Sequence, residues 1–260
     1  MKSVTESMVP TAALVLGANR GIGLGFVKRI LAGNAVSLIY ATYRHRASAE
    51  ELYALAADEP RLRLLALDIT EECQIEACLL TIGQELKESG RSLTHVINCV
   101  GLLHQGDLQP EKSLRQIDAA NLVTYFQVNS IASILLAKHL VPLLKQTDRA
   151  IFATLSAKVG SIGDNQLGGW YGYRASKSAL NMFMKSIAIE YHRSCRGTIV
   201  VVLHPGTTDT RLSQPFQRNV APEKLFSVDR CVEQLSQVMA GLTIEDSGEF
   251  FSWDGTRLPW

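Results

Sequence analysis

The sequence predicts an α/β fold, a doubly wound parallel sheet of about seven strands with helices on both faces. Short apolar runs alternate with longer helical segments, and a glycine-rich turn directly follows the first run. Hydrophobic residues make up 47% of the 260 residues and charged residues 20%, which is typical of a soluble protein with a sizeable core. Because nothing between these segments is composed like a linker, we expect one domain over residues 1–260, with residues 1–10 as a loose tail.

The short apolar runs are the expected strands. Buried strands of a parallel sheet are nearly continuous in apolar residues, because helices cover both faces. We expect strands at residues 12–16, 37–42, 62–67, 95–99, 150–155, 198–203 and 249–253. In such sheets the ligand lies beyond the carboxyl ends of the strands, so the residues that follow each run are candidates for a site.

The segments between these runs are the expected helices. One begins at the glycine-rich turn and ends near residue 31, and a second begins near residue 48. A third ends near residue 87 and can be capped by Thr70. Three more are expected at 114–144, 171–191 and 228–239, with a long polar loop at 205–226.

Charge and cysteine content limit the partners and the compartment. The net charge of +1 gives no general reason to expect a nucleic acid or an anionic membrane as partner. The first apolar run is too short for a secretory signal or a membrane span. The odd number of cysteines and the absence of a Cys-x-x-Cys pair indicate reduced thiols, no metal site and a cytoplasmic protein; the cysteines are Cys73, Cys78, Cys99, Cys195 and Cys231.

The turn Gly17-Ala-Asn-Arg-Gly-Ile-Gly23 stands between the first strand and its helix. Glycine lets the backbone turn tightly and approach a pyrophosphate, which then lies on the N–H groups and positive dipole end of the helix. The spacing differs from the commoner Gly-x-Gly-x-x-Gly, and a purely structural turn is the alternative. We expect cofactor contacts along the whole turn, at Gly17, Asn19, Arg20, Gly21, Ile22 and Gly23.

Cations rather than an acid follow the second strand. A carboxylate there usually holds a free ribose 2′-hydroxyl, whereas a 2′-phosphate needs positive charge. Arg44 and Arg46 stand at the strand end and Arg20 projects from the glycine turn, so NADP(H) is favoured and NAD(H) is possible. The alternative is that these arginines are only solvated. The missing acid also argues against an S-adenosylmethionine methyltransferase, which would usually hold the ribose with a carboxylate here. Asp68, after the third strand, either accepts a hydrogen bond from the adenine amino group or caps a helix.

Tyr173 and Lys177 are the candidate reacting pair. Residues four apart lie on the same face of a helix, so the ammonium can share a pocket with the phenol. A nearby positive charge favours the phenolate and lowers the tyrosine pKa from about 10 toward the working pH, where a general acid or base is most useful. Tyr171 cannot take this part, because Ala175 stands four residues after it. A lone Tyr-x-x-x-Lys is usually an ordinary helix feature, so its weight depends on the other motifs.

Taken together, the motifs resemble those of the short-chain dehydrogenase/reductase family over nearly the whole chain, which implies a Rossmann-type fold. They occur in the family's order: Gly17-x-x-x-Gly21-x-Gly23, Asp68, Asn98, Asn129, Ser156, Tyr173-x-x-x-Lys177 and Pro205-Gly206. Three stretches are similar to the C-factor-like subgroup: Leu-Ser-Ala-Lys-Val-Gly-Ser from Leu155, Leu-Gly-Gly-Trp-Tyr from Leu167 and the ending Trp-Asp-Gly-Thr-Arg-Leu-Pro-Trp.

The resemblance implies roles that the chemistry of each residue allows. Tyr173 would exchange a proton with the substrate oxygen, while Lys177 would hold the nicotinamide ribose. Ser156 would donate a hydrogen bond to the developing alkoxide, and Asn129 would anchor a water through which Lys177 exchanges protons. Further cofactor contacts are implied at Arg44, Asp68, Ile69, Asn98, Gly101, Pro205, Gly206, Thr208 and Thr210.

Three further features of the motifs concern the loops. The family's Asn-Asn-Ala-Gly run reads Asn98-Cys99-Val100-Gly101 here, which puts a bulkier valine near the adenosine side. The interval from Ser156 to Tyr173 is longer than is usual in the family, so the loop between them must bulge. The loop at 211–226 would cover the substrate with Phe216 and Phe226.

We therefore expect an NADP(H)-dependent oxidoreductase that interconverts a carbonyl and an alcohol on a small-molecule substrate. The alternative is a C-factor-like signalling or regulatory protein that binds a nucleotide and acts by interaction. The presence of Ser156, Tyr173 and Lys177 favours chemistry, since a pure binder has no need of them. By resemblance, a homodimer or homotetramer is expected through the helix at 114–144 and the Tyr-Lys helix.

Overall fold

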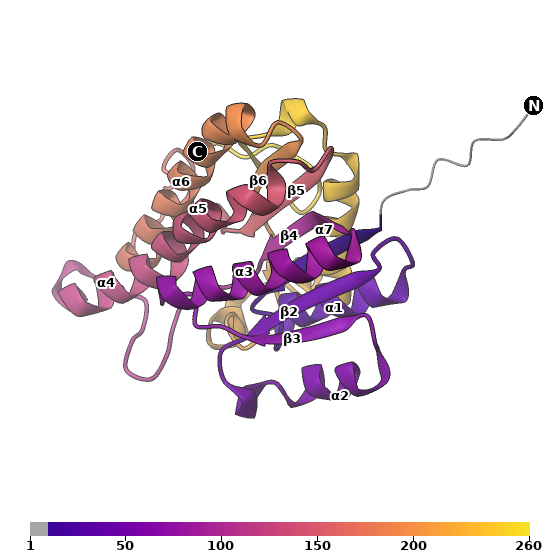
Figure 1. The fold of residues 1–260 in the computed structure, drawn as a ribbon. Helices are drawn as coiled ribbons and strands as arrows, with labels where there is room; N and C mark the ends of the chain where they lie inside the picture. Colours follow the sequence, from indigo (N-terminus) through magenta and orange to yellow (C-terminus); the bar gives the residue numbers. More distant parts are fainter. Residues whose placement is uncertain (1–9) are drawn as a thin grey trace, which may run out of the picture.

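The computed structural model describes residues 10–260 as a seven-stranded sheet with helices on both sides (Figure 1). The strand order is β3-β2-β1-β4-β5-β6-β9, and every neighbouring pair is parallel. The strands are β1 (Thr11–Leu16), β2 (Leu38–Tyr43), β3 (Leu62–Ala66), β4 (Ser92–Asn98), β5 (Ala150–Leu155), β6 (Thr198–His204) and β9 (Glu249–Ser252). The predicted doubly wound parallel sheet is confirmed. The predicted N-terminal tail lies outside the described residues except for Pro10.

Two separate apolar cores attach the helices to the two faces of the sheet. One core joins the sheet to α3, α5 and α6, and the other joins it to α1, α2 and α7. The helices are α1 (Gly21–Ala32), α2 (Glu50–Asp58), α3 (Glu72–Ser89), α4 (Ala119–Phe126), α5 (Ala132–Leu144), α6 (Tyr171–Ser194) and α7 (Val228–Gly241).

Strand β5 shows how the sheet divides its side chains between the two cores. All six of its residues are buried. Phe152 lies in the core with α6, whereas Ile151, Ala153 and Leu155 lie in the core with α1 and α7. This alternation follows from the strand geometry, in which successive side chains point to opposite faces.

The long helix expected at 114–144 is interrupted. A short 3₁₀ turn covers Leu114–Gln116, and α4 begins only at Ala119. A π-helical turn, Gln127–Ile131, then separates α4 from α5. Such turns insert an extra residue into a helix and occur frequently at functional sites.

Two smaller expectations also differ from the structure. Thr70 does not cap α3, because its hydroxyl donates to Asp68 Oδ1 (2.7 Å) and Glu71 occupies the cap position without a side-chain bond. The segment expected as a polar loop at 205–226 contains a small parallel pair, β7 (Thr207–Thr208) with β8 (Leu225–Phe226).

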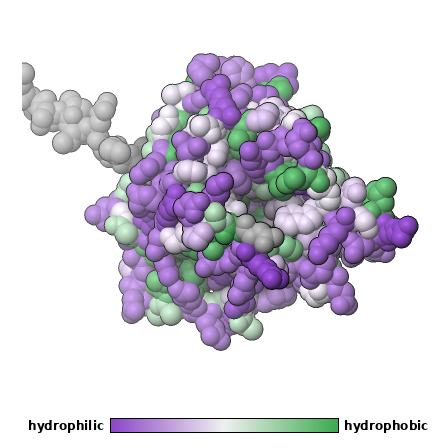
Figure 2. All heavy atoms as spheres, turned by 180° about the vertical axis from the view of Figure 1, so that it is seen from behind, coloured by the Kyte–Doolittle hydropathy of each residue, from purple (hydrophilic) through white to green (hydrophobic). Residues whose placement is uncertain are grey.

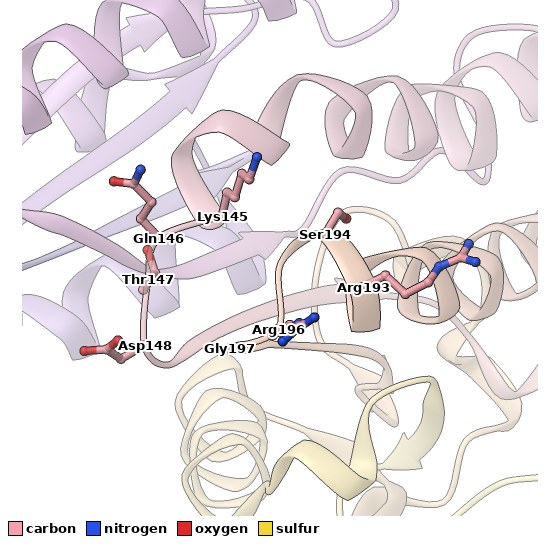
Figure 3. Close-up of a pocket in the computed structure, with 8 residues that line it drawn as sticks. All are labelled: Lys145, Gln146, Thr147, Asp148, Arg193, Ser194, Arg196 and Gly197. Atoms are coloured by element: carbon pink, nitrogen blue, oxygen red, sulfur yellow. The ribbon is translucent and has the colours of Figure 1, made fainter.

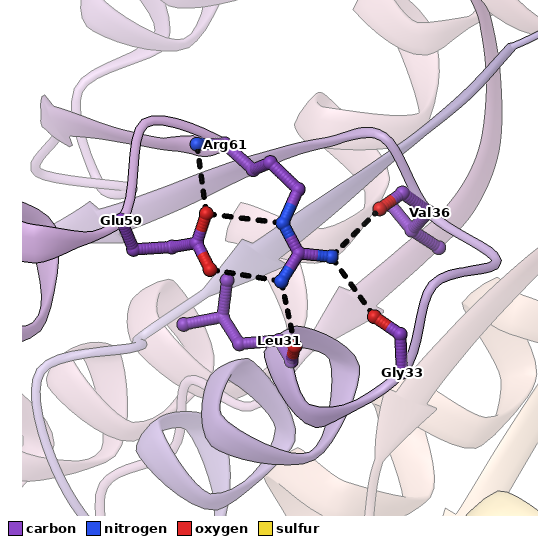
Figure 4. Close-up of polar contacts among 5 residues, drawn as sticks. All are labelled: Leu31, Gly33, Val36, Glu59 and Arg61. Atoms are coloured by element: carbon purple, nitrogen blue, oxygen red, sulfur yellow. Dashed lines mark hydrogen bonds and ion pairs between the residues drawn. The ribbon is translucent and has the colours of Figure 1, made fainter.

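Arg61 joins the end of α1 to the start of β3 at the amino edge of the sheet (Figure 4). Its guanidinium donates to the carbonyl oxygens of Leu31 (2.6 Å) and Gly33 (2.9 Å) and pairs with Glu59 (2.8 Å). The last carbonyls of a helix have no partner within the helix, so this contact satisfies groups that would otherwise need water.

The face shown in Figure 2 is mainly hydrophilic, with small separate apolar areas. Among residues 10–260, the run Ala119–Leu144 is long and apolar enough to cross a membrane by length and composition alone. The core helix of a soluble protein passes the same test. Here α5 packs against α3 and α6.

Candidate active site

The predicted site residues gather at the carboxyl edge of the sheet. Gly17 directly follows β1, the segment 99–101 follows β4, Ser156 follows β5 and Pro205 follows β6. Because all strands are parallel, these residues share one edge. The structure therefore brings together segments that are as much as 188 positions apart, from Gly17 to Pro205.

The glycine-rich turn has the geometry that a pyrophosphate requires. Gly17 and Gly21 have φ of 69° and 53°, where side chains other than glycine are strained. The helix α1 has no side-chain cap and no acid in its first turn, so its N-terminal N–H groups stay available to an anion. The amide of Asn19 donates to the Ser48 carbonyl (3.0 Å) and ties the turn to the loop after β2.

Gly23 is expected to tolerate no side chain. A Cβ there would lie 2.2 Å from the Gly17 carbonyl oxygen. Gly23→Ala should therefore distort the turn, lower the unfolding free energy by ~2–4 kcal/mol and weaken NADPH binding. Gly241→Ala is the control, since nothing lies within 4 Å of that Cβ, and it should leave both properties near wild type. Thermal denaturation and fluorescence titration with NADPH measure the two effects, and equal behaviour of the two variants would contradict the assignment.

Three arginines meet beside the glycine turn. Partial burial and the charges of Arg211 and Arg44 lower the pKa of Arg20. Arg46 instead lies over the ring of Tyr53, with 3.6 Å from its guanidinium carbon to the ring centroid. Arg211 is a member of this group that the sequence analysis missed, because it comes from the loop after β7, far away in the chain. A cluster of positive charges is suited to a phosphate.

The residues expected near adenosine are held by bonds within the protein. Asp68 accepts from Thr70, and although partial burial opposes ionisation, these bonds and Arg44 hold its pKa below the usual value. Ile69 is buried in the core with α3. The Asn98 amide donates to Ser133 Oγ (3.0 Å) and its oxygen accepts from Val100 N (3.1 Å). Asn98 thus fixes the end of β4 against α5.

Tyr173 and Lys177 lie together on α6 as predicted, and both are buried. The Lys177 Nζ lies 5.9 Å from the centroid of the Tyr173 ring and donates to the Leu155 carbonyl (3.0 Å). Burial lowers the pKa of Lys177 to about 8. The expected lowering of the Tyr173 pKa is absent from this structure, because burial raises the pKa of that phenol. At neutral pH the pair therefore consists of a protonated phenol and a buried ammonium.

Asn129 lies in the π-helical turn and binds the loop after β4. Its Oδ1 accepts from Leu102 N (2.7 Å), and its amide donates to the Leu102 carbonyl (2.9 Å) and to Ser176 Oγ (3.0 Å). A Cβ on Gly101 would lie 3.6 Å from Lys177 Nζ and 3.8 Å from Asn129 Oδ1. Gly101, Asn129 and Lys177 are therefore neighbours, so Asn129 and Lys177 are close enough to act on the same water.

Ser156 does not lie as its expected role requires. Its hydroxyl is buried and donates to Asn181 Oδ1 on α6 at 2.8 Å. A hydroxyl has a single proton, so none is left for a substrate oxygen in this arrangement. The following residue, Ala157, packs instead against the cluster that contains Tyr173.

The segment after β6 lies against the glycine turn. Thr210 Cγ2 would be 3.2 Å from a Cβ on Gly21, and Thr208 is buried with its hydroxyl donating to the Pro205 carbonyl (3.2 Å). Gly206 has φ of 70°, and a Cβ there would lie 2.5 Å from the Phe226 ring. Phe226 is therefore a core residue beneath this segment, and the expectation that it covers the substrate is wrong.

Aromatic side chains surround the Tyr173 ring. Ring centroids lie 6.2 Å apart between Tyr173 and Trp170, 6.3 Å between Tyr173 and Tyr125, and 4.9 Å between Trp170 and Phe216. Trp170 has φ of 50°, which is unusual for a residue with a side chain. The predicted place of Phe216 above the site is thus consistent with the structure, and the surroundings of the phenol are apolar.

Glu111 is a second residue that the sequence analysis missed. It is 3% exposed, and its Oε2 accepts from Gly172 N (3.1 Å) in the first turn of α6. Its carbonyl accepts from Trp170 N (2.5 Å). A carboxylate at a helix N-terminus is favourable, so Glu111 holds the start of the helix that carries Tyr173. An isolated glutamate in a loop gives no signal of this in the sequence.

A separate open cleft lies at the opposite edge of the sheet (Figure 3). Its lining comes from the loops before β5 and β6 and from the last turn of α6, with Lys145, Asp148, Arg193 and Arg196 among the lining residues. It contains none of the predicted site residues. Since ligands of doubly wound sheets lie beyond the carboxyl ends, this cleft is not the candidate site.

Comparison with known proteins agrees with this geometry. The family model for short chain dehydrogenases matches residues 11–221. The C-signal protein of Myxococcus xanthus is 32% identical over 148 residues, which are 57% of this chain and 84% of that protein. The NADPH-bound carbonyl reductase from chicken fatty liver has a TM-score of 0.86 and 31% identity, covering 97% of this chain and 99% of that one. The carbonyl reductase Sniffer of D. melanogaster has a TM-score of 0.85 and 28% identity, covering 96% and 100%.

These matches confirm the family that the sequence predicts, including its similarity to the C-factor-like subgroup. The chain belongs to the short-chain dehydrogenase family and is a nicotinamide-dependent oxidoreductase that acts on C=O and CH–OH groups.

Proposed function

We propose that the protein reduces a small-molecule carbonyl compound with NADPH, or oxidises the alcohol with NADP⁺. One observation supports this most directly: the Tyr173 phenol belongs to an apolar cluster at the carboxyl edge of the sheet, one helical turn from the buried ammonium of Lys177. The uncapped N-terminus of α1 lies at the same edge. A phenol, a buried amine and an uncapped helix N-terminus at one edge of the sheet support the proposal together.

Tyr173 is the proposed general acid in the reductive direction. The nicotinamide, when bound, supplies the hydride to the carbonyl carbon. Tyr173 gives its proton to the oxygen, so that the alcohol forms, and Lys177 stabilises the phenolate that remains. Burial makes this charge pairing stronger than it would be in water.

Lys177 and Asn129 are the proposed route for the return of the proton. The Lys177 Nζ uses one bond to the Leu155 carbonyl, which leaves donors for the ribose hydroxyls of a bound nucleotide. Asn129 fixes the loop beside this amine through Leu102. We propose that a water held at this point connects Lys177 to solvent.

The preference for NADP(H) is proposed to come from Arg20 and Arg44, with Arg211 as a third cation. Arg44→Ala is expected to weaken NADPH binding by ~10-fold, because a charge-assisted bond to the 2′-phosphate is lost, while NADH binding changes little. Arg29→Ala is the control: Arg29 stands at the far end of α1, paired with Glu233 at 2.8 Å. Fluorescence titration with each nucleotide measures the ratio, and an equal loss for NADPH and NADH would contradict the proposal.

The activity is tested by NADPH oxidation across a panel of aliphatic, aromatic and dicarbonyl compounds. We expect oxidation that depends on both carbonyl and protein, with NADPH preferred to NADH. No cofactor binding and no oxidation with any member of the panel would contradict the proposed function.

A signalling or regulatory role is the second candidate. The similarity to the C-signal protein favours it, although the match covers only 57% of this chain. If a Tyr173→Phe variant still binds the cofactor and still produces the signalling response of the wild type, the protein acts by interaction with a partner rather than by turnover of a substrate.

We further propose a cytoplasmic homodimer or homotetramer that does not bind nucleic acid or membrane. Apolar side chains exposed on α4, α6 and the π-helical turn support self-association; they are Val123, Ile131, Met182 and Ile189. Light scattering of the purified protein measures the assembly directly.

A further inference from the structure

Only one of the two residues at the end of β5 faces the reacting phenol. Ala157 has an extended backbone, with φ of −146° and ψ of 144°. On an extended chain, neighbouring side chains point to opposite sides, so Ser156 and Ala157 cannot both face Tyr173. Phe152 and Ser156 are an even number of residues apart, so their side chains point to the same side of the strand. Phe152 lies in the core with α6, and Ser156 binds Asn181 on α6.

Ser156 is held against the middle of α6 by a buried bond to Asn181. Its hydroxyl donates to Asn181 Oδ1 at 2.8 Å, and the residue is 4% exposed. The amide of Asn181 donates to the Gly160 carbonyl at 3.4 Å, which keeps the oxygen of Asn181 turned toward Ser156. The Ser156 proton is thus engaged two helical turns beyond Tyr173.

Ala157, in contrast, contacts the start of α6, where Tyr173 lies. It packs against the cluster of Leu102, Leu103, Leu108, Tyr125 and Tyr173. It is only partly buried, so an additional oxygen atom would have space.

We propose that position 157, and not Ser156, faces the substrate oxygen, and that its alanine offers no hydrogen bond there, so that among residues 10–260 Tyr173 is the side-chain donor at that point. Ser156 is then a positioning residue that ties β5 to α6 through Asn181. The inference rests on the proposed function, because it concerns the oxygen to which Tyr173 gives its proton. A hydroxyl at 157 would donate a hydrogen bond to the developing alkoxide without transferring its proton.

Cysteine labelling tests which of the two side chains faces the site, and it does not depend on enzyme activity. The background variant is Cys73→Ser, which removes an exposed thiol. We expect N-ethylmaleimide to label Ala157→Cys and NADP⁺ to slow that labelling, while Ser156→Cys stays protected. Mass spectrometry of the peptides reads both sites. Labelling of Ser156→Cys together with protection of Ala157→Cys would overturn the inference, whatever the activity of the protein.

The kinetic consequence is tested with three variants. Ala157→Ser is expected to raise kcat for carbonyl reduction by ~10-fold, since a well-placed donor changes rates by 10²–10³-fold and an added one is less well placed. Ser156→Ala should keep kcat within ~3-fold while lowering Tm, because Asn181 loses its partner. The double variant Ser156→Ala/Ala157→Ser moves the hydroxyl by one residue and should match Ala157→Ser in kcat.

The opposite pattern would overturn the inference. A fall of kcat by ~10²-fold in Ser156→Ala at unchanged Tm, with Ala157→Ser no faster than wild type, would return the donor role to Ser156. A wild type that oxidises no NADPH would instead contradict the proposed function, and the labelling result would still decide which residue faces the site.

Discussion

Tyr173→Phe is expected to lower kcat for carbonyl reduction by ~10²–10⁴-fold, because the variant has no proton to give to the product oxygen. NADPH affinity and stability should stay near wild type. The ring packs against Tyr125 and Trp170, and phenylalanine keeps those contacts. Among residues 10–260, the Tyr173 hydroxyl makes no hydrogen bond with another group, so its removal leaves no partner unsatisfied.

Tyr171→Phe is the matched control for this variant. Tyr171 is the first residue of the same helix and has no lysine one turn later. We expect its kcat to be close to wild type. Steady-state kinetics with one carbonyl substrate compare the two phenols, and a similar loss in both variants would remove Tyr173 from the reaction.

Lys177→Met is expected to separate activity from stability. Loss of the ammonium should lower kcat/KM by ~10²-fold or more, since the phenolate and the nucleotide ribose both lose a partner. At neutral pH the unfolding free energy should nevertheless rise by about 1–3 kcal/mol, because the wild type buries a charge whose pKa falls from 10.5 to about 8. Methionine has a similar length and needs no hydrogen bond. Kinetics and denaturant unfolding of the same preparation test both statements.

The destabilisation that we expect from the buried Lys177 ammonium should depend on pH. The folded pKa of Lys177 lies below the unfolded value, so between pH 8 and 10.5 the unfolded chain holds a proton that the folded protein has lost. From this group, wild-type stability therefore increases with pH through that window. The advantage of Lys177→Met should be full below pH 8 and should shrink toward pH 10.5. An advantage that grows with pH would show that burial does not control this lysine.

The strands and the glycine turn could be predicted because their signals are local. The run Ala150–Leu155 is apolar except for Thr154, and only a strand covered on both faces buries every residue. Gly17, Gly21 and Gly23 mark positions where backbone conformation or close approach excludes a side chain. Tyr173 and Lys177 meet because of helix periodicity alone.

The remaining features depend on contacts that sequence spacing does not show. The π-helical turn at Asn129 interrupts a segment whose composition fits one continuous helix. The side that Ser156 faces depends on where β5 ends, and a shift of one residue along a strand reverses every side chain. Arg211 and Glu111 reach the site from loops whose course is fixed only by tertiary contacts.

The pKa of Tyr173 is another property that sequence spacing alone does not predict. Helical spacing places a cation near the phenol, and the sequence therefore suggests a lowered pKa. Burial, which depends on the whole fold, raises it instead. The proposed mechanism accordingly uses Tyr173 as a proton donor in the reductive direction.

Deuterium transfer tests the central claim most directly. NADPH deuterated at nicotinamide C4 is incubated with the protein and a carbonyl compound that it reduces, and the alcohol is analysed by mass spectrometry. We predict that deuterium from one face of the ring appears on the carbinol carbon, and that Tyr173→Phe reduces the amount formed by ~10²-fold or more. Alcohol without deuterium from either face, or equal deuterated product from Tyr173→Phe, would contradict hydride transfer with Tyr173 as the proton donor.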